Sequence, residues 1–187
     1  MLMRYLMLRL NAPIMSFGDA ASQYQNVRDT ATNPTKSMVV GMIACAMGID
    51  RNDSKVHLLS NELTIKTTTI NKQATFWRDY QNAHLRDIDE HGHYGSKDDK
   101  NGQRWKTYIA NGNYLIFIGS DDEDLLKRIH AALRRPQWPL FVGRKCCTLS
   151  ARVVTENYQS YDEKAIQDVV IDFNNKMEDL VTLCTCQ

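Results

Sequence analysis

The sequence predicts an α+β fold of the ferredoxin-like type, a split β-α-β arrangement with an inserted arm and a short C-terminal β extension. The apolar patterning runs strand, helix, strand, then a long polar insertion, then strand, helix, strand. The length of 187 residues and the apolar content of 43% suffice for one large domain with a real core. The RNA-recognition fold shares this order, although the aromatic signature of its classical version is absent.

The first half of the predicted fold consists of a strand, a helix and a second strand. Residues 3–10 place leucines at alternate positions, which predicts a half-buried strand. A helix that is apolar almost all round is expected to begin at Thr35 or Ser37 and to end at Gly48. Residues 62–70 are rich in β-branched side chains and predict the second strand.

Residues 71–112 differ from the rest of the chain because they are polar and charged, with aromatic residues gathered at the two ends. We interpret them as an inserted arm. The middle, 86–103, has the composition of a mobile tip. The roots are expected to be fixed by Phe76, Trp77, Trp105 and Tyr108.

The second half begins with a clear strand at 113–119. The helix that follows has a capping box of Ser120 and Glu123 and stops at Pro136. Residues 139–143 predict the fourth strand, which the ferredoxin-like order would place against the first strand.

The remaining chain carries a further predicted strand at 151–157 and a weaker strand pattern at 168–173. We therefore predict a ferredoxin-like RNA-binding domain at 1–150, with the arm at 71–112, and a C-terminal extension at 151–187.

The charge is unevenly distributed. The net charge of +1 argues against an indiscriminate nucleic-acid binder. Residues 162–187 hold two lysines against six acidic residues, a net charge of −4, whereas the other 161 residues hold 21 basic and 16 acidic side chains. This pattern fits either chance segregation on a solvated surface or a body that meets a polyanion while the tail faces elsewhere.

Composition also predicts the compartment. No apolar run approaches the roughly 18 residues that span a bilayer, and the first residues lack the features of a signal peptide. The five cysteines show no disulfide framework. We expect a cytoplasmic protein without a membrane partner.

No segment predicts a metal, a cofactor or a catalytic centre. Asp89, Glu90, His91 and His93 have the right side chains for a metal, but a solvated loop tip would not hold them rigidly. The pairs Cys146-Cys147 and Cys184-x-Cys186 lack the usual zinc spacing and are better explained as buried free thiols. Walker and dinucleotide fingerprints are absent from the sequence.

Two short stretches favour an anion site. In "RRPQWPLFVGRKCC" (134–147), Gly143 permits close backbone approach, and Arg144 and Lys145 follow it directly. In "NPTKS", Lys36 and Ser37 stand at a helix N-terminus, where free N–H groups and the helix dipole favour an anion. An ordinary helix cap with a solvated lysine is about equally compatible with the second stretch.

Four stretches together resemble the Cas-five (CasD) family of CRISPR-associated proteins in its type I-E form. They are "YLMLRLNAPIMSFG", "NPTKSMVVGMIACAMGIDRND", "FWRDYQNA" with "RWKTYIANGNY", and "RRPQWPLFVGRKCCTL". The resemblance runs to about residue 150. The sequence departs from the family at Phe17, where tryptophan is usual, and at Lys145-Cys146-Cys147-Thr148.

The resemblance implies a non-catalytic subunit of the Cascade surveillance complex that grips the 5′ handle of CRISPR RNA. The arm would be the thumb of the family. Its implied partners are CRISPR RNA, the Cas-seven-like backbone subunit, the large subunit and, through the complex, target DNA. The expected RNA-binding residues are Met15, Phe17, Arg28, Lys36, Ser37, Arg78, Arg104, Arg144 and Lys145.

Alternatives remain for the whole protein and for single residues. An endoribonuclease of the same superfamily would use His91 or His93, Tyr94 and Lys97. A small-ligand module would purify without nucleic acid as a dimer through its sheet. At the site itself, Phe17 stacks on a base or belongs to the core, and Arg144 binds RNA or pairs with an acid in the tail.

Overall fold

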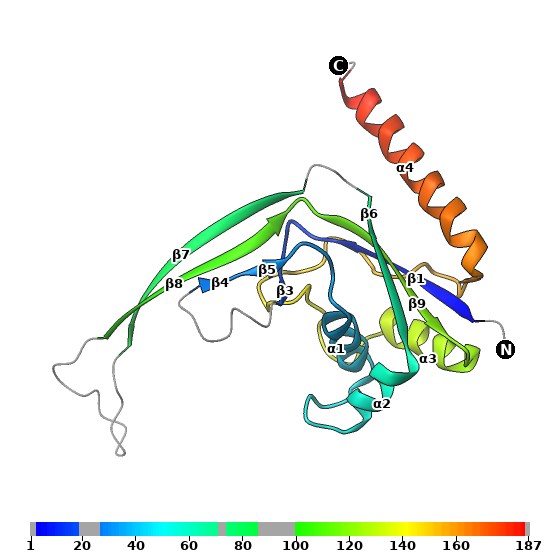
Figure 1. Ribbon diagram of the computed structural model, residues 1–187, viewed down its shortest axis with the longest axis horizontal. Coiled ribbons are helices and arrows are strands. Elements are labelled where there is room, and N and C mark those ends of the chain that lie inside the picture. Colours follow the sequence, from blue (N-terminus) through cyan, green and yellow to red (C-terminus); the bar gives the residue numbers. More distant parts are fainter. Residues whose placement is uncertain (1–2, 19–26, 71–73, 86–99, 186–187) are drawn as a thin grey trace.

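The structure, a computed structural model, describes residues 3–18, 27–70, 74–85 and 100–185 (Figure 1). It is a mixed α/β fold with a central antiparallel sheet, a second sheet that carries the arm, a two-stranded ribbon of β3 (Phe17–Gly18) and β5 (Thr30–Ala31), and four helices in the described residues.

The central sheet has four strands in the order β10-β1-β9-β6, and each neighbouring pair is antiparallel. Every residue of β9 is buried, because β1 and β6 flank it and side chains cover both of its faces. The bounds are β1 Arg4–Asn11, β6 Thr64–Thr69, β9 Asn113–Ser120 and β10 Ser160–Tyr161.

Helices α1 (Lys36–Met47) and α3 (Glu123–Arg134) cover one face of this sheet and enclose the main core with the leucines of β1. The predicted limits of α1 are confirmed, since Thr35 caps it and Gly48 ends it with φ 71°. The N-cap of α3 is Asp122, which accepts hydrogen bonds from two backbone N–H groups of the first turn. The predicted capping box at Ser120 is therefore wrong.

Two helices were not predicted from the sequence, the C-terminal helix described next and α2 (Lys55–Glu62). Most side chains of α2 are exposed, and only Leu59 is buried. The eight residues of α2 are too few to establish a helical period of apolar residues.

The opposite face of the sheet is covered by α4 (Glu163–Thr185), shown in orange to red in Figure 1. The strands predicted at 151–157 and 168–173 are wrong. Residues 168–173 belong to α4, and 151–157 follow an irregular path on which the carbonyl of Val153 accepts a hydrogen bond from Arg9. In the described chain after residue 150, the only strand is the short β10. No helix in the described part of the chain is long and apolar enough to cross a membrane.

The arm is a hairpin of β7 (Thr75–Leu85) and β8 (Lys100–Ala110) that extends from the body (Figure 1). Its base continues into the second sheet, where β8 pairs with β2 (Ile14–Met15) and β4 (Val27–Arg28). The predicted insertion with ordered roots is a β-ribbon, and its predicted tip lies largely outside the described residues.

The strand predicted at 139–143 is also wrong. Residues 141–148 form a turn, in which the Val142 N–H donates to the carbonyl of Cys147 and Phe141 forms a single bridge with Thr148. Gly143 has φ 89°, which breaks an extended path. The place beside β1 is taken by β10 instead.

We expect Gly143→Ala to destabilise the fold strongly. A Cβ at this position would lie 1.6 Å from the carbonyl oxygen of Ser16, and the positive φ disfavours a side chain in any case. The melting temperature should fall by an amount corresponding to more than about 3 kcal/mol.

The matched control is Gly41→Ala. A Cβ there meets nothing within 4 Å, and the residue lies inside α1, so alanine should stabilise by roughly 0.5–1 kcal/mol. Equal melting temperatures for the two variants would contradict the tight contact at Gly143.

Candidate functional site

The turn at Gly143 lies directly on the loop that follows β1. The Ser16 N–H donates to the carbonyl of Val142 at 3.1 Å, and the Gly143 backbone passes so close to Ser16 that no side chain fits between them. The expectation that Arg144 and Lys145 lie beside the loop carrying Met15 and Phe17 is confirmed, although a turn and not a strand delivers them.

Arg144 joins this turn to the base of the arm. Its guanidinium donates to the carbonyl of Thr107 on β8 at 3.0 Å and to the carbonyl of Arg28 on β4 at 2.9 Å. The same group lies 4.5 Å from the ring centroid of Tyr108. Among the described residues no carboxylate pairs with it, which gives no support to the alternative in which Arg144 pairs with an acid in the tail. The side chains of Glu178 and Asp179 in that tail lie outside the described residues.

The buried Cys147 thiol, close to Arg144, is unsuited to nucleophilic chemistry. Burial raises the pKa of Cys147 to about 11. Burial, followed by the contact with the Cys146 thiol, raises the pKa of Tyr108, against a smaller lowering effect of Arg144. A thiol with such a pKa is protonated at neutral pH and is a poor nucleophile.

Met15 and Phe17 are core residues with no exposed surface. The Phe17 ring packs edge-on against Tyr114, with 5.2 Å between the ring centroids. The backbone N–H of Phe17 donates to the hydroxyl of Thr30 at 2.7 Å. The predicted stacking of Phe17 on a base is therefore wrong, because neither face of the ring is accessible.

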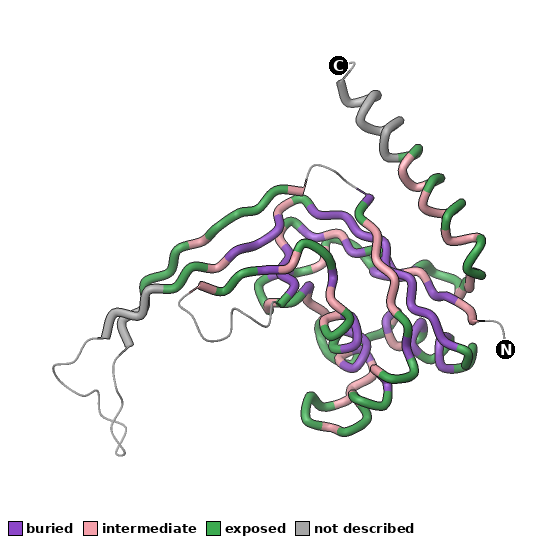
Figure 2. Tube along the Cα trace, in the orientation of Figure 1, coloured by how far each residue is buried: buried purple, intermediate pink, exposed green. Residues whose placement is uncertain are grey.

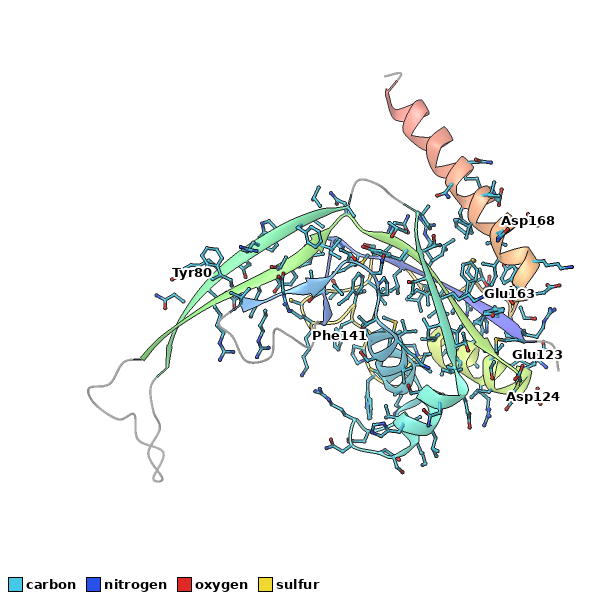
Figure 3. All side chains as sticks on the ribbon, viewed as in Figure 1. Tyr80, Glu123, Asp124, Phe141, Glu163 and Asp168 are labelled. Carbon is cyan, nitrogen blue, oxygen red and sulfur yellow. The ribbon has the colours of Figure 1, made fainter. Side chains whose placement is uncertain are left out.

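A cleft of about 920 Å³ opens between α1, the Gly143 turn and β4. Its lining includes the polar residues Arg28, Ser37, Arg51 and Arg144. It also includes the apolar residues Met38, Leu140, Phe141 and Trp138, of which Trp138 is 43% exposed. Figure 3 shows Phe141 beside α1.

Three cations line the cleft, Arg28, Arg51 and Arg144, whereas Lys36 and Lys145 are chain neighbours of lining residues. None of the five has an ion-pair partner within the described ranges. The acidic side chain lining the cleft is Asp29, which accepts a hydrogen bond from the Thr30 N–H. The cleft is thus suited to an anionic ligand with an apolar part.

Arg78 and Arg104 lie on the arm and not in the cleft. Arg78 faces Thr107 across the ribbon and Arg104 faces Gln81. Because strand residues alternate between faces, this register places the two arginines on opposite sides of the hairpin. The structure brings them neither to each other nor to Arg144.

Aromatic pairs occupy both faces of the arm. Trp77 and Tyr108 lie 5.5 Å apart on one face, and Tyr80 and Trp105 lie 4.7 Å apart on the other. Of the four expected root anchors, only Tyr108 is buried; Phe76, Trp77 and Trp105 are each at least 41% exposed.

Two residues of the cleft were missed at the sequence level, Arg51 and Trp138. Trp138 lies between Pro136 and Pro139 in the sequence. Nothing in this local pattern distinguishes an exposed aromatic residue from one in the core. Arg51 follows the C-terminal glycine of α1, where a basic residue is common at any helix end.

The described residues contain no group of three histidine, cysteine, aspartate or glutamate side chains able to hold a metal ion. The residues of the alternative nuclease centre, His91, His93, Tyr94 and Lys97, lie outside the described residues.

Comparisons with known proteins connect this geometry to one family. A family model described as CRISPR-associated protein (Cas_Cas5) matches residues 5–175. The CRISPR system Cascade subunit CasD of Escherichia coli (strain K12) is 23% identical over 172 residues, which cover 87% of this chain and 75% of that protein.

Two solved structures share the fold. A chain of a CRISPR RNA-guided surveillance complex aligns with a TM-score of 0.65 and 22% identity over 80% of this chain. A crystal structure of a Cas protein aligns with a TM-score of 0.58 and 26% identity over 83% of this chain. This chain spans 61% and 64% of those two chains, respectively.

Arg144→Ala should lower the melting temperature by an amount corresponding to roughly 2 kcal/mol, because two backbone carbonyls lose a charged donor. Hydrogen exchange should become faster in β4 and in residues 104–110. Lys145→Ala is the control, since its exposed side chain makes no described contact that holds the arm. Unchanged exchange in the Arg144 variant would show that the guanidinium does not link the arm to the turn.

Proposed function

Because this chain belongs to the CRISPR-associated Cas5 family, we propose that it is a non-catalytic Cascade subunit that binds the 5′ handle of CRISPR RNA. In this proposal the RNA lies in the cleft between α1 and the Gly143 turn. The proposed partners are CRISPR RNA, the Cas-seven-like backbone subunit that the protein caps, the large subunit and, through the complex, target DNA. The named relative is a Cascade subunit, and one structural relative comes from an RNA-guided surveillance complex.

The observation that carries the proposal is the set of cations that line the cleft and have no ion-pair partner among the described residues. Arg28, Arg51 and Arg144 line it, and Lys36 stands at the N-terminus of α1, where backbone N–H groups add to the positive potential. An RNA backbone supplies one negative charge per nucleotide, so a single strand would occupy these sites in succession.

The apolar residues that line the cleft can supply the other interaction of single-strand recognition, the stacking of bases. Trp138 presents an exposed aromatic surface in the same cleft as the arginines. Unpaired bases stack on such surfaces while their phosphates contact basic groups. This assigns to Trp138 the stacking role that the sequence suggested for Phe17.

We also propose that the central sheet with α1 and α3 is a ferredoxin-like unit. The order β10-β1-β9-β6 supports this, because it is the order of a split β-α-β fold if β10 takes the part of the fourth strand. The free thiols of Cys45, Cys146 and Cys147 support a cytoplasmic location.

The first test measures RNA affinity against salt concentration with a single-stranded handle RNA. Lys36→Ala combined with Arg51→Ala should weaken binding and reduce the slope of log K against log salt by about 0.7 for each lost phosphate contact. Lys127→Ala, on the exposed face of α3, is the control and should change neither quantity. Affinity that stays unchanged at low salt would exclude the cleft as the RNA site.

The same titration distinguishes base stacking on Trp138 from phosphate contacts with the basic residues. Trp138→Ala should weaken binding by roughly 1–3 kcal/mol without changing the salt slope, because stacking involves no charge. A reduced slope in this variant would show that Trp138 affects the phosphate contacts of the neighbouring basic residues.

The second test concerns catalysis. Alanine at His91, His93 and Tyr94 together should leave processing of repeat RNA by the whole system intact, because the proposed role is binding alone. Cleavage is followed on repeat RNA without added metal, and RNA binding by the variant is the control. Lost processing with preserved binding would favour the nuclease alternative.

A further inference from the structure

One acidic residue lies among the basic residues of the cleft. Asp29 lines the cleft together with Arg28, Arg51 and Arg144. Figure 2 shows the chain exposed at the end of β4 and buried from the start of β5, and Asp29 occupies an exposed position between the two strands. Asp29 is therefore accessible to a ligand in the cleft.

The Asp29 carboxylate keeps most of its capacity to accept hydrogen bonds. Its Oδ1 accepts one hydrogen bond, from the Thr30 N–H at 3.2 Å. No lysine or arginine in the described ranges forms an ion pair with it, although three arginines line the same cleft. Because an ionised carboxylate has about four lone-pair sites, both oxygens can still accept from a ligand.

The negative charge of Asp29 is not explained by its local hydrogen bond. An asparagine or serine in a turn would also accept from the Thr30 N–H. A carboxylate in a cleft that receives phosphates repels them and so lowers the affinity for every RNA sequence. The charge is useful only where the ligand also presents N–H donors to it.

The Watson–Crick edges of the four RNA bases differ in the donors that they offer. Guanine presents two adjacent donors, N1–H and N2–H, which match the two oxygens of one carboxylate. In adenine and cytosine the amino group lies beside a ring nitrogen that is an acceptor, and in uracil the N–H lies between two carbonyl acceptors. A carboxylate accepts only, so these neighbouring acceptors repel it.

We propose that Asp29 is the specificity-determining residue of the cleft and that it accepts hydrogen bonds from N1–H and N2–H of one unpaired guanine. The inference rests on the proposed function, in which single-stranded RNA occupies the cleft. Phosphate contacts position a nucleic acid, whereas contacts to base edges select its sequence. Asp29 adds the second kind of contact to a cleft whose arginines supply the first.

The first experiment identifies the base that the cleft selects. Short single-stranded RNAs of random sequence are bound to the full chain, and the retained RNA is sequenced. We expect guanine to be enriched at one position with the wild-type chain but not with Asp29→Asn, because the amide nitrogen carries donors that repel those of guanine. Glu62→Gln removes the same charge at the exposed end of α2, outside the cleft lining, and should keep the enrichment.

The outcomes of this selection separate the inference from the proposed function. Retained RNA without a guanine preference would overturn the role of Asp29 and leave RNA binding in the cleft intact. A guanine preference that survives in Asp29→Asn would do the same. If the wild-type chain retains no RNA, both the inference and the proposed function are overturned.

The second experiment compares affinities for the selected RNA and for the same RNA with inosine in place of the enriched guanine. Inosine lacks the N2 amino group, so the wild-type chain should bind it at least about fivefold more weakly. Asp29→Asn should lose this difference and keep the melting temperature, because asparagine still accepts from the Thr30 N–H. A variant that still distinguishes guanine from inosine would contradict the proposal.

RNA made of uridine alone distinguishes base selection from a purely structural role of Asp29. This RNA should bind more tightly to Asp29→Asn than to the wild-type chain, because the variant lacks the negative charge that repels phosphates. If Asp29 only maintained the shape of the cleft, the variant would bind every RNA more weakly, and that result would also overturn the proposal.

Discussion

The backbone contact between Gly143 and Ser16 is the constraint on which the cleft depends. It joins two loops from opposite ends of the domain without a side chain between them. The contact fixes the direction in which the chain leaves the turn, and Arg144 then reaches β4 and β8 at once. One glycine therefore sets both a wall of the cleft and the attachment of the arm.

Arg144 differs in kind from the other cations of the cleft. A guanidinium has five donors in a planar fork, and two backbone carbonyls occupy part of that fork here. Arg144 also lines the cleft. The residue thus combines a structural task with a recognition task, which a lysine with its single point charge would perform poorly.

Much of the fold could be predicted from local patterns. The limits of α1 followed from Thr35 and Gly48, and the strands β1, β6 and β9 followed from alternation or β-branched content. The wrongly predicted strands lie after residue 138, while before it helix α2 was missed and the N-cap of α3 was misplaced. Val169, Val170 and Ile171 favour a strand locally, but they belong to a helix that covers the sheet with one apolar side.

The site was harder to predict than the elements, because exposure is decided by tertiary packing. Phe17 and Trp138 are both aromatic residues near glycine or proline, and nothing local distinguishes them. Packing against Tyr114 buries the first, while the second remains on the cleft wall. The juxtaposition of Arg144 with the loop after β1 was predicted from a strand at 139–143 that the structure does not contain, and the turn at Gly143 brings it about instead.

The position of β1 has a consequence for synthesis on the ribosome. This first strand lies in the middle of the central sheet, and both of its neighbours, β9 and β10, come from residues beyond 112. At a translation rate of about 5–20 residues per second, β1 waits roughly 5 to 20 s before a neighbour emerges. Its alternating leucines are exposed during that time, so the nascent chain depends on chaperones or on early contact with α1 to keep them from aggregating.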